Sequence, residues 1–110
     1  MAEATVMNVV SFLISQLQEE GLQPDRIILF GSQADNTATQ SSDIDLAIIS
    51  SAFRNRDSVQ RALMTRQAEI RTIKTFVVPL DIITLTPEEL DDEESLISGY
   101  VRKGKTVFAA

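Results

Sequence analysis

Two pairs of residues in the first half of the chain could do chemistry together. Gly31 and Ser32 end a short apolar run, and Asp43 and Asp45 open the next apolar run after ten intervening polar and small residues. Glycine lets the backbone approach a ligand closely, and the N–H groups where a strand opens into a helical turn attract an anion. Neighbouring carboxylates repel each other unless a cation lies between them. The pattern therefore predicts a site for an anion and a hard divalent cation such as Mg²⁺.

Asp81 is a third acidic candidate, farther along the chain. It interrupts an apolar run that we expect to form a largely buried strand, where a lone carboxylate is costly unless it is paired or bound to metal. Side chains two residues apart on a strand share a face, so Asp43 and Asp45 should point the same way. If the strand of Asp81 lies beside theirs, the three carboxylates could hold two Mg²⁺ ions and align a nucleoside triphosphate for in-line attack.

Each of these signals has a simpler explanation when it is taken alone. A Gly-Ser pair after a strand is usually only a turn, and Asp-x-Asp is more often a strand start or a solvated cap. Asp81 could satisfy a backbone donor or lie at a sheet edge. The larger acidic run over residues 88–94 is best interpreted as helix N-terminal charge and solvated surface. Only the combination of the two pairs with Asp81 favours a site.

The helices that must position these residues follow from the spacing of apolar side chains. Spacings of three and four predict helices over residues 2–20 and about 58–74. In the second of these helices, the side chains expected to face inward are Val59, Leu63, Met64, Ala68 and Ile70 or Ile73. A further helix should begin where Thr, Pro and two acids follow one another at residues 86–89.

Continuous apolar runs predict strands that are buried on both faces. Three such runs and a possible last edge strand lie at residues 27–30, 43–50, 76–85 and 106–108. The order helix, strand, strand, helix, strand, helix and possible strand predicts an α/β (α+β) fold. We expect a small mixed β-sheet of three to four strands, packed against helices on one side. The 110 residues should form a single domain, residues 1–110, with its own core.

Composition excludes several kinds of chemistry. The chain has no Cys and no His, which removes disulfides, thiolate sites, the commonest general base and the usual zinc ligand. Its net charge is -6, so a long nucleic acid is disfavoured as a ligand. A small polyanion carried with divalent metal is compatible with that charge, and so is docking to a basic partner.

The chain shows no sign of a membrane or export segment. Its first turn carries an acid instead of a cationic region, and no apolar run approaches the roughly 20 residues that span a bilayer. We therefore expect a cytoplasmic protein with no membrane partner. A homo-oligomer is possible through the first helix or the tail over residues 107–110, although both segments are more often core.

The two pairs and Asp81 together resemble a known signature. Gly31-Ser32, ten residues, then Asp43-x-Asp45 is similar to the pattern of the DNA polymerase β-like nucleotidyltransferase superfamily. With the later acid Asp81, the short chain looks most like a minimal nucleotidyltransferase (MNT). The resemblance implies the nucleotidyltransferase fold. It also implies that Gly31 and Ser32 bind the triphosphate, that Asp43 and Asp45 bind the metals, and that Asp81 is a third metal-binding carboxylate, which activates the attacking hydroxyl.

The resemblance also implies an activity and a partner. Such enzymes commonly transfer AMP from ATP to a hydroxyl with Mg²⁺. Many minimal members are antitoxins of a toxin–antitoxin system and are paired with a helical toxin that has a HEPN domain, of which they can adenylylate a tyrosine. Two alternatives stay open. One is an MNT-fold binding module that neutralises a partner by docking. The other is an antibiotic nucleotidyltransferase, which ranks last because those enzymes usually carry an added helical domain.

One part of the chain departs from the family pattern. After Gly-Ser, the usual run is Arg-Ala-Arg-Gly, whereas here it is Gln33-Ala34-Asp35-Asn36. Replacing an arginine with an acid near a triphosphate exchanges an attraction for a repulsion. We therefore expect weaker nucleotide binding unless another cation compensates. Arg54 and Arg56 are the candidates that the sequence offers.

Overall fold

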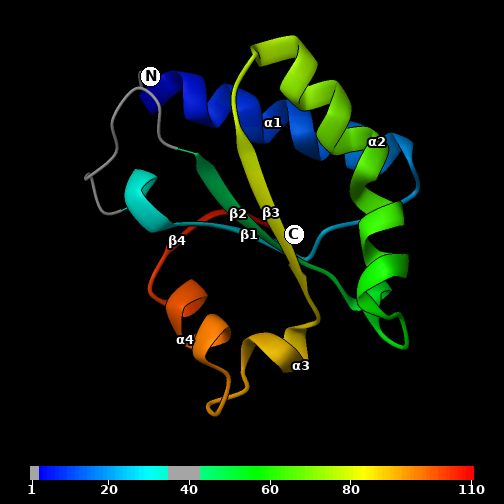
Figure 1. The fold of residues 1–110 in the computed structure, drawn as a ribbon, viewed down its shortest axis with the longest axis vertical. Coiled ribbons are helices and arrows are strands. Elements are labelled where there is room, and N and C mark those ends of the chain that lie inside the picture. The colour runs from blue at the N-terminus through cyan, green and yellow to red at the C-terminus, as the bar shows by residue number, and fades with distance from the viewer. Residues whose placement is uncertain (1–2, 35–42) are drawn as a thin grey trace.

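The computed structural model describes residues 3–34 and 43–110 (Figure 1). Its elements follow the expected order, and the last strand forms. They are α1 (Glu3–Glu19), β1 (Arg26–Phe30), the 3₁₀ helix η1 (Gly31–Gln33), β2 (Ile44–Ile49), the 3₁₀ helix η2 (Ser51–Phe53), α2 (Ser58–Phe76), β3 (Leu80–Leu85), α3 (Pro87–Leu90), α4 (Leu96–Arg102) and β4 (Lys105–Ala109).

The strands form one mixed sheet, as predicted. Its order is β3-β2-β1-β4. β1 pairs antiparallel with β2 and β4, whereas β2 and β3 are parallel. Parallel neighbours need a long crossover, and α2 provides it between β2 and β3. In this strand order, β3 and β4 are the two edges of the sheet, and β1 and β2 are its centre.

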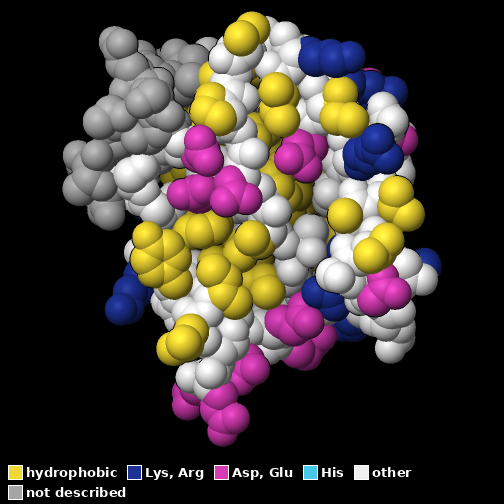
Figure 2. Space-filling view, in the orientation of Figure 1, with side chains coloured by type: hydrophobic (Ala, Val, Ile, Leu, Met, Phe, Trp, Pro, Cys, Tyr) yellow, Lys and Arg dark blue, Asp and Glu magenta, His cyan; other side chains and the backbone are white. Residues whose placement is uncertain are grey.

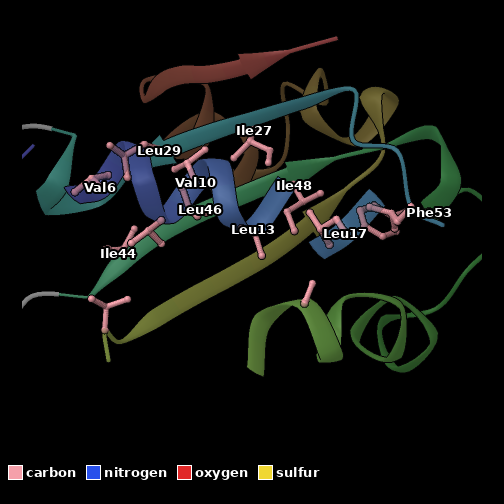
Figure 3. Close-up of a cluster of buried hydrophobic side chains, with 14 residues drawn as sticks. Val6, Val10, Leu13, Leu17, Ile27, Leu29, Ile44, Leu46, Ile48 and Phe53 are labelled. Atoms are coloured by element: carbon pink, nitrogen blue, oxygen red, sulfur yellow. The ribbon is translucent and has the colours of Figure 1, made fainter. Parts of the chain in front are cut away.

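Helices cover both faces of the sheet, so the expectation of helices on one side is wrong. Ile27 and Leu29 of β1 belong to a first core with the apolar stripe of α1 (Figure 3). Ile28 and Phe30 face a second core, which α3 and α4 cover. The physical reason is that β1 is apolar at consecutive positions, so each face of the strand needs its own cover.

The second face is covered at one end only. α3 lies beside the carboxyl ends of β2 and β3, where Ile49, Leu85 and Leu90 pack together, and α4 lies beside β1 (Figure 1). Asp45 and Asp81 lie on this same face at the beginnings of the two strands, because each is two residues before a member of the second core. The open end of the sheet is therefore where the predicted acids lie.

The second helix and third strand differ from the prediction in two ways. α2 continues to Phe76 and ends at Val77 in the left-handed region (φ 52°), so β3 begins at Leu80 and not at residue 76. Phe76 packs against the core from α2, and the centroid of its ring is 5.6 Å from that of Phe12. A short apolar run suits a helix end as well as a strand, and only packing against α1 decides between them.

The predicted inward face of α2 is wrong at Val59 and Leu63, whereas Ala68 is buried and Met64 packs against the core as predicted. Val59 and Leu63 are 67% and 62% exposed, whereas Thr65, Ala68 and Thr72 are buried. The two threonines bond backbone carbonyls of their own helix, which satisfies their hydroxyls. Among the helices that the structure describes, none has the length and apolar character needed to cross a membrane.

Candidate functional site

The parallel pairing of β2 with β3 brings two of the predicted acids together. Asp45 is directly opposite Asp81 in the register, and on its other side it is opposite Phe30 of β1. Directly opposed residues of paired strands point to the same face. Asp43 immediately precedes β2. The condition set by the sequence, that the strand of Asp81 lies beside that of Asp45, is therefore met.

The three carboxylates interact electrostatically. Partial burial raises the pKa of the Asp45 carboxyl, and the negative charges of Asp81 and then Asp43 raise this pKa further. Asp43 and Asp81 are themselves exposed. The expectation that the strand of Asp81 is largely buried is wrong, because β3 is an edge strand, and the alternative that Asp81 lies at a sheet edge is confirmed. Crowded carboxylates of this kind are stabilised in their charged form by a cation.

Gly31 connects the Gly-Ser turn to the acids. It follows β1 at the start of η1 and has a φ of +74°, in the left-handed region that favours glycine. A Cβ atom at this position would lie 2.2 Å from Oδ2 of Asp45. A side chain here would have to displace that carboxylate, whereas glycine leaves it in place, so an anion held at Gly31 and Ser32 would lie next to the carboxylates.

The carboxylates fit a magnesium ion that arrives with a phosphate ligand. Within residues 3–34 and 43–110, no three acidic side chains already converge with the geometry of a metal site. Mg²⁺ is usually bound by one or two carboxylates together with substrate phosphates and waters, rather than by a cage made only of protein. Asp45 and Asp81 on adjacent strands match that ligand set. Two bound ions stay a prediction.

Glu69 belongs to the same charged region and was not predicted. It projects from α2, where partial burial raises its pKa and the charge of Asp81 raises it further. It lines a groove of about 330 Å³ between α2 and β3, together with Thr65 and Ile82. The sequence did hold a signal, because Glu69 follows Thr65 by four residues and so lies on the buried stripe of the helix. A prediction from apolar residues alone misses this stripe, because Thr65 and Thr72 on it are polar.

The structure also locates the residues that were expected to affect nucleotide binding. Arg54 forms an ion pair of 2.6 Å with Glu88, and it lies beyond Ile49, the end of β2, which is about 13 Å from Asp45 at strand spacing. The suggestion that Arg54 replaces the missing arginines is therefore wrong. Gln33 is half-buried in η1, whereas Asp35 and Asn36 lie outside the described residues.

The surface over this region has a mixed character. Figure 2 shows acidic side chains gathered over the upper parts of β2 and β3, next to a group of hydrophobic side chains over α4. The exposed apolar residues of α4 are Leu96, Ile97 and Tyr100, at 93%, 46% and 53% exposure. The site is therefore an open surface that borders an apolar one.

Solved structures share this fold. A presumed nucleotidyltransferase from Sulfolobus solfataricus has a TM-score of 0.64 and 19% identity over 80% of this chain and 73% of its own. A toxin–antitoxin structure with AMP-PNP has a TM-score of 0.64 and 20% identity over 94% of this chain and 73% of its own. The BolA domain of SufE1 from Arabidopsis thaliana has a TM-score of 0.51 and 20% identity over 81% of this chain and 99% of its own.

The sequence comparisons identify the family of this chain, which the shared fold alone does not. At identities of 19–20% a likeness shows the fold alone, and one fold can host unrelated functions. Among curated proteins, none matches this sequence. A family model described as a nucleotidyltransferase domain matches residues 10–103, which include the Gly-Ser turn and all three predicted acids. The chain therefore belongs to the nucleotidyltransferase domain family.

Proposed function

We propose that this protein is a Mg²⁺-dependent nucleotidyltransferase that transfers AMP from ATP to a hydroxyl of a partner protein. We further propose that it is the antitoxin of a HEPN/MNT toxin–antitoxin pair in the cytoplasm. One observation carries the proposal: Asp45 lies against Gly31 on one side and opposite Asp81 on the other. The likeness to a toxin–antitoxin structure with AMP-PNP supports it.

The proposed roles follow the geometry. Gly31 and Ser32 would bind the triphosphate, Asp43 and Asp45 would hold metal, and Asp81 would be a further ligand that accepts the proton of the attacking hydroxyl. The acceptor oxygen forms a bond to the α-phosphorus. At the same time, the bond between that phosphorus and the oxygen bridging to the β-phosphate breaks, so pyrophosphate leaves. Bound Mg²⁺ would neutralise the phosphate charge during this transfer.

The open shape of the site favours an acceptor that another protein presents. Asp81 is exposed on an edge strand, so a hydroxyl can reach it from outside the sheet. Beside it, Glu69 and the groove between α2 and β3 offer a shallow, partly apolar surface. A small molecule would make few contacts in so shallow a groove, whereas a partner protein would add a contact surface of its own.

Label transfer from ATP tests the proposal. The protein is incubated with ATP labelled in the α-phosphate, Mg²⁺ and the protein encoded by the neighbouring gene. We expect label on the partner, and we expect the Asp43→Ala plus Asp45→Ala variant to lose it. Glu93→Ala plus Glu94→Ala removes the same charge from an exposed loop and should transfer normally. Absence of transfer, or transfer that survives loss of both aspartates, would refute the proposal.

The second candidate is a binding module with the same fold and no turnover. Its support is that the described part of the chain has no preassembled group of three acidic metal ligands, and that Gln33 stands where the family has arginine. Calorimetry with ATP and Mg²⁺ separates the two functions. Binding in the micromolar range favours the enzyme, whereas undetectable binding by a protein that still neutralises its partner favours the module.

A further inference from the structure

A second pocket opens beside Gly31, between the Gly-Ser turn and α4. Its volume is about 250 Å³, and its lining residues are Phe30, Gly31, Ala34, Tyr100, Lys103 and Gly104. Gly31 is thus shared between this pocket and the acids, since it also lies against Asp45. A ligand held at the turn could extend into this pocket.

Close packing of α4 against β1 fixes the pocket. A Cβ atom at Gly104 would lie 2.4 Å from the backbone oxygen of Leu29, so the chain after α4 passes directly beside the strand. The ring of Tyr100 packs edge to face on that of Phe30, with centroids 5.8 Å apart. Two constraints, one on each side of Lys103, therefore hold this part of the chain next to the turn.

Lys103 is the basic side chain that lines this pocket. Its neighbour Arg102 is directed elsewhere, since its guanidinium donates to the backbone oxygens of Leu90 and Asp92 near α3. Lys105 is opposite Leu29 in the register, so it points to the face of the first core and away from the acids. Of these three neighbouring cations, Lys103 alone is placed beside Gly31.

A triphosphate at the Gly-Ser turn needs positive charge in this pocket. The neighbouring surface already carries Asp43, Asp45 and Asp81, and the family arginines after Gly-Ser are replaced in this chain. An anion beside three carboxylates is repelled unless cations offset them. Mg²⁺ can offset the acids, but the end of the triphosphate away from the metal would still lack a counter-charge.

We propose that Lys103 binds the terminal phosphates of the nucleotide in the pocket between the Gly-Ser turn and α4, and so takes over the charge of the missing arginines. The inference rests on the proposed function, because it takes the triphosphate to lie at Gly31. An ammonium group on a flexible stem suits this role, since it can meet a phosphate as a point charge without a fixed angle.

Calorimetry on the whole protein with Mg²⁺ tests the inference with ATP, inorganic tripolyphosphate and AMP as separate ligands. For Lys103→Ala we expect the Kd to rise about tenfold for ATP and for tripolyphosphate, the loss of one charged contact. The Kd for AMP should change by less than about twofold, because AMP lacks the terminal phosphates. Lys105→Ala is the matched control and should bind all three ligands like the wild type. Lys103→Arg should restore most of the affinity for ATP.

The outcomes separate this inference from the proposed function. If Lys103→Ala binds ATP as tightly as the wild type while Asp43→Ala plus Asp45→Ala does not, the inference fails and the nucleotide site stands. An equal loss for AMP and ATP also overturns it. If ATP binding depends on Lys103 but no AMP is transferred to any partner, the inference holds and the proposed function fails. Absence of ATP and tripolyphosphate binding by the wild type refutes both.

Discussion

Gly31 is the position at which the turn and the acids come closest. Gly31→Ala should cost about 1–2 kcal/mol because alanine is strained at positive φ. It should also weaken nucleotide binding, because the new methyl group must displace the carboxylate of Asp45. Thermal unfolding and calorimetry with ATP measure the two effects.

Gly21→Ala is the matched control for that change. Gly21 also has a positive φ, of +82°, but a Cβ atom there would meet nothing within 4 Å. It should lose similar stability from backbone strain and keep its affinity for ATP. If both variants bind ATP equally well, the contact between Gly31 and Asp45 has no part in binding.

Asp45 should destabilise the protein in the absence of metal and nucleotide. Its folded-state pKa is raised by burial and by Asp81 and Asp43, so ionising it costs more in the folded state than in the unfolded one. Stability should therefore fall as pH rises from the unfolded pKa through the folded pKa. Asp45→Asn removes this cost and should raise Tm by roughly 3 °C at neutral pH. There should be no difference in strong acid, where the wild-type carboxyl is protonated.

A lower Tm for Asp45→Asn at neutral pH would contradict this prediction. Glu93→Gln, on an exposed loop, controls for the change in net charge.

At the scale of elements, an ion pair joins α2 to α3. The guanidinium of Arg61 donates to both carboxylate oxygens of Glu89, at 2.6 and 3.3 Å. The Arg61 side chain is 13% exposed, against 45% for Glu89. The hydrogen bond from Arg61 is the main cause that lowers the pKa of Glu89. This pair holds α3 beside the crossover helix and so fixes which end of the sheet stays open.

Glu89→Gln tests the ion pair without removing the helix cap, because glutamine can replace glutamate in the capping box with Thr86. The loss should be about 0.5 kcal/mol at pH 7, after allowing for solvent around Glu89. A lowered folded-state pKa gives stability that is present above the unfolded pKa and is lost as pH falls through the folded pKa. The variant and wild type should therefore converge in acid. Glu88→Gln, which changes the exposed pair with Arg54, should have a smaller effect, and an equal effect would argue against a special role for Glu89.

At the scale of the whole molecule, the net charge of -6 opposes binding of a nucleotide without metal. Chelation of Mg²⁺ by EDTA should raise the Kd for ATP by about tenfold or more, because the carboxylates of the site and the phosphates of ATP then repel each other with no cation between them. The Asp43→Ala plus Asp45→Ala variant should lose most of this metal dependence. Calorimetry in EDTA and in Mg²⁺ measures it, and equal ATP affinity in the two conditions would exclude a metal-bridged site.

The sequence determined the local parts of this protein. The order of helices and strands, the cap at Thr86 and the glycine-serine turn depend on nearest neighbours and on a period of two or 3.6 residues. The same spacing placed Asp43 and Asp45 together, and the resemblance it carries led to the family that the chain belongs to. These features need no knowledge of which segments meet in space.

Tertiary structure decided what depends on segments that are far apart in the chain. Strand order made β3 an edge, so Asp81 is exposed, and the packing of α1 and α2 turned residues 76–79 into a helix end instead of a strand. Glu69 lies near Asp81 from α2, and Lys103 lies in one pocket with Gly31 from the end of α4. No spacing in the sequence relates either residue to Gly31, because their distances are set by how the two cores pack on the sheet and not by the chain between them.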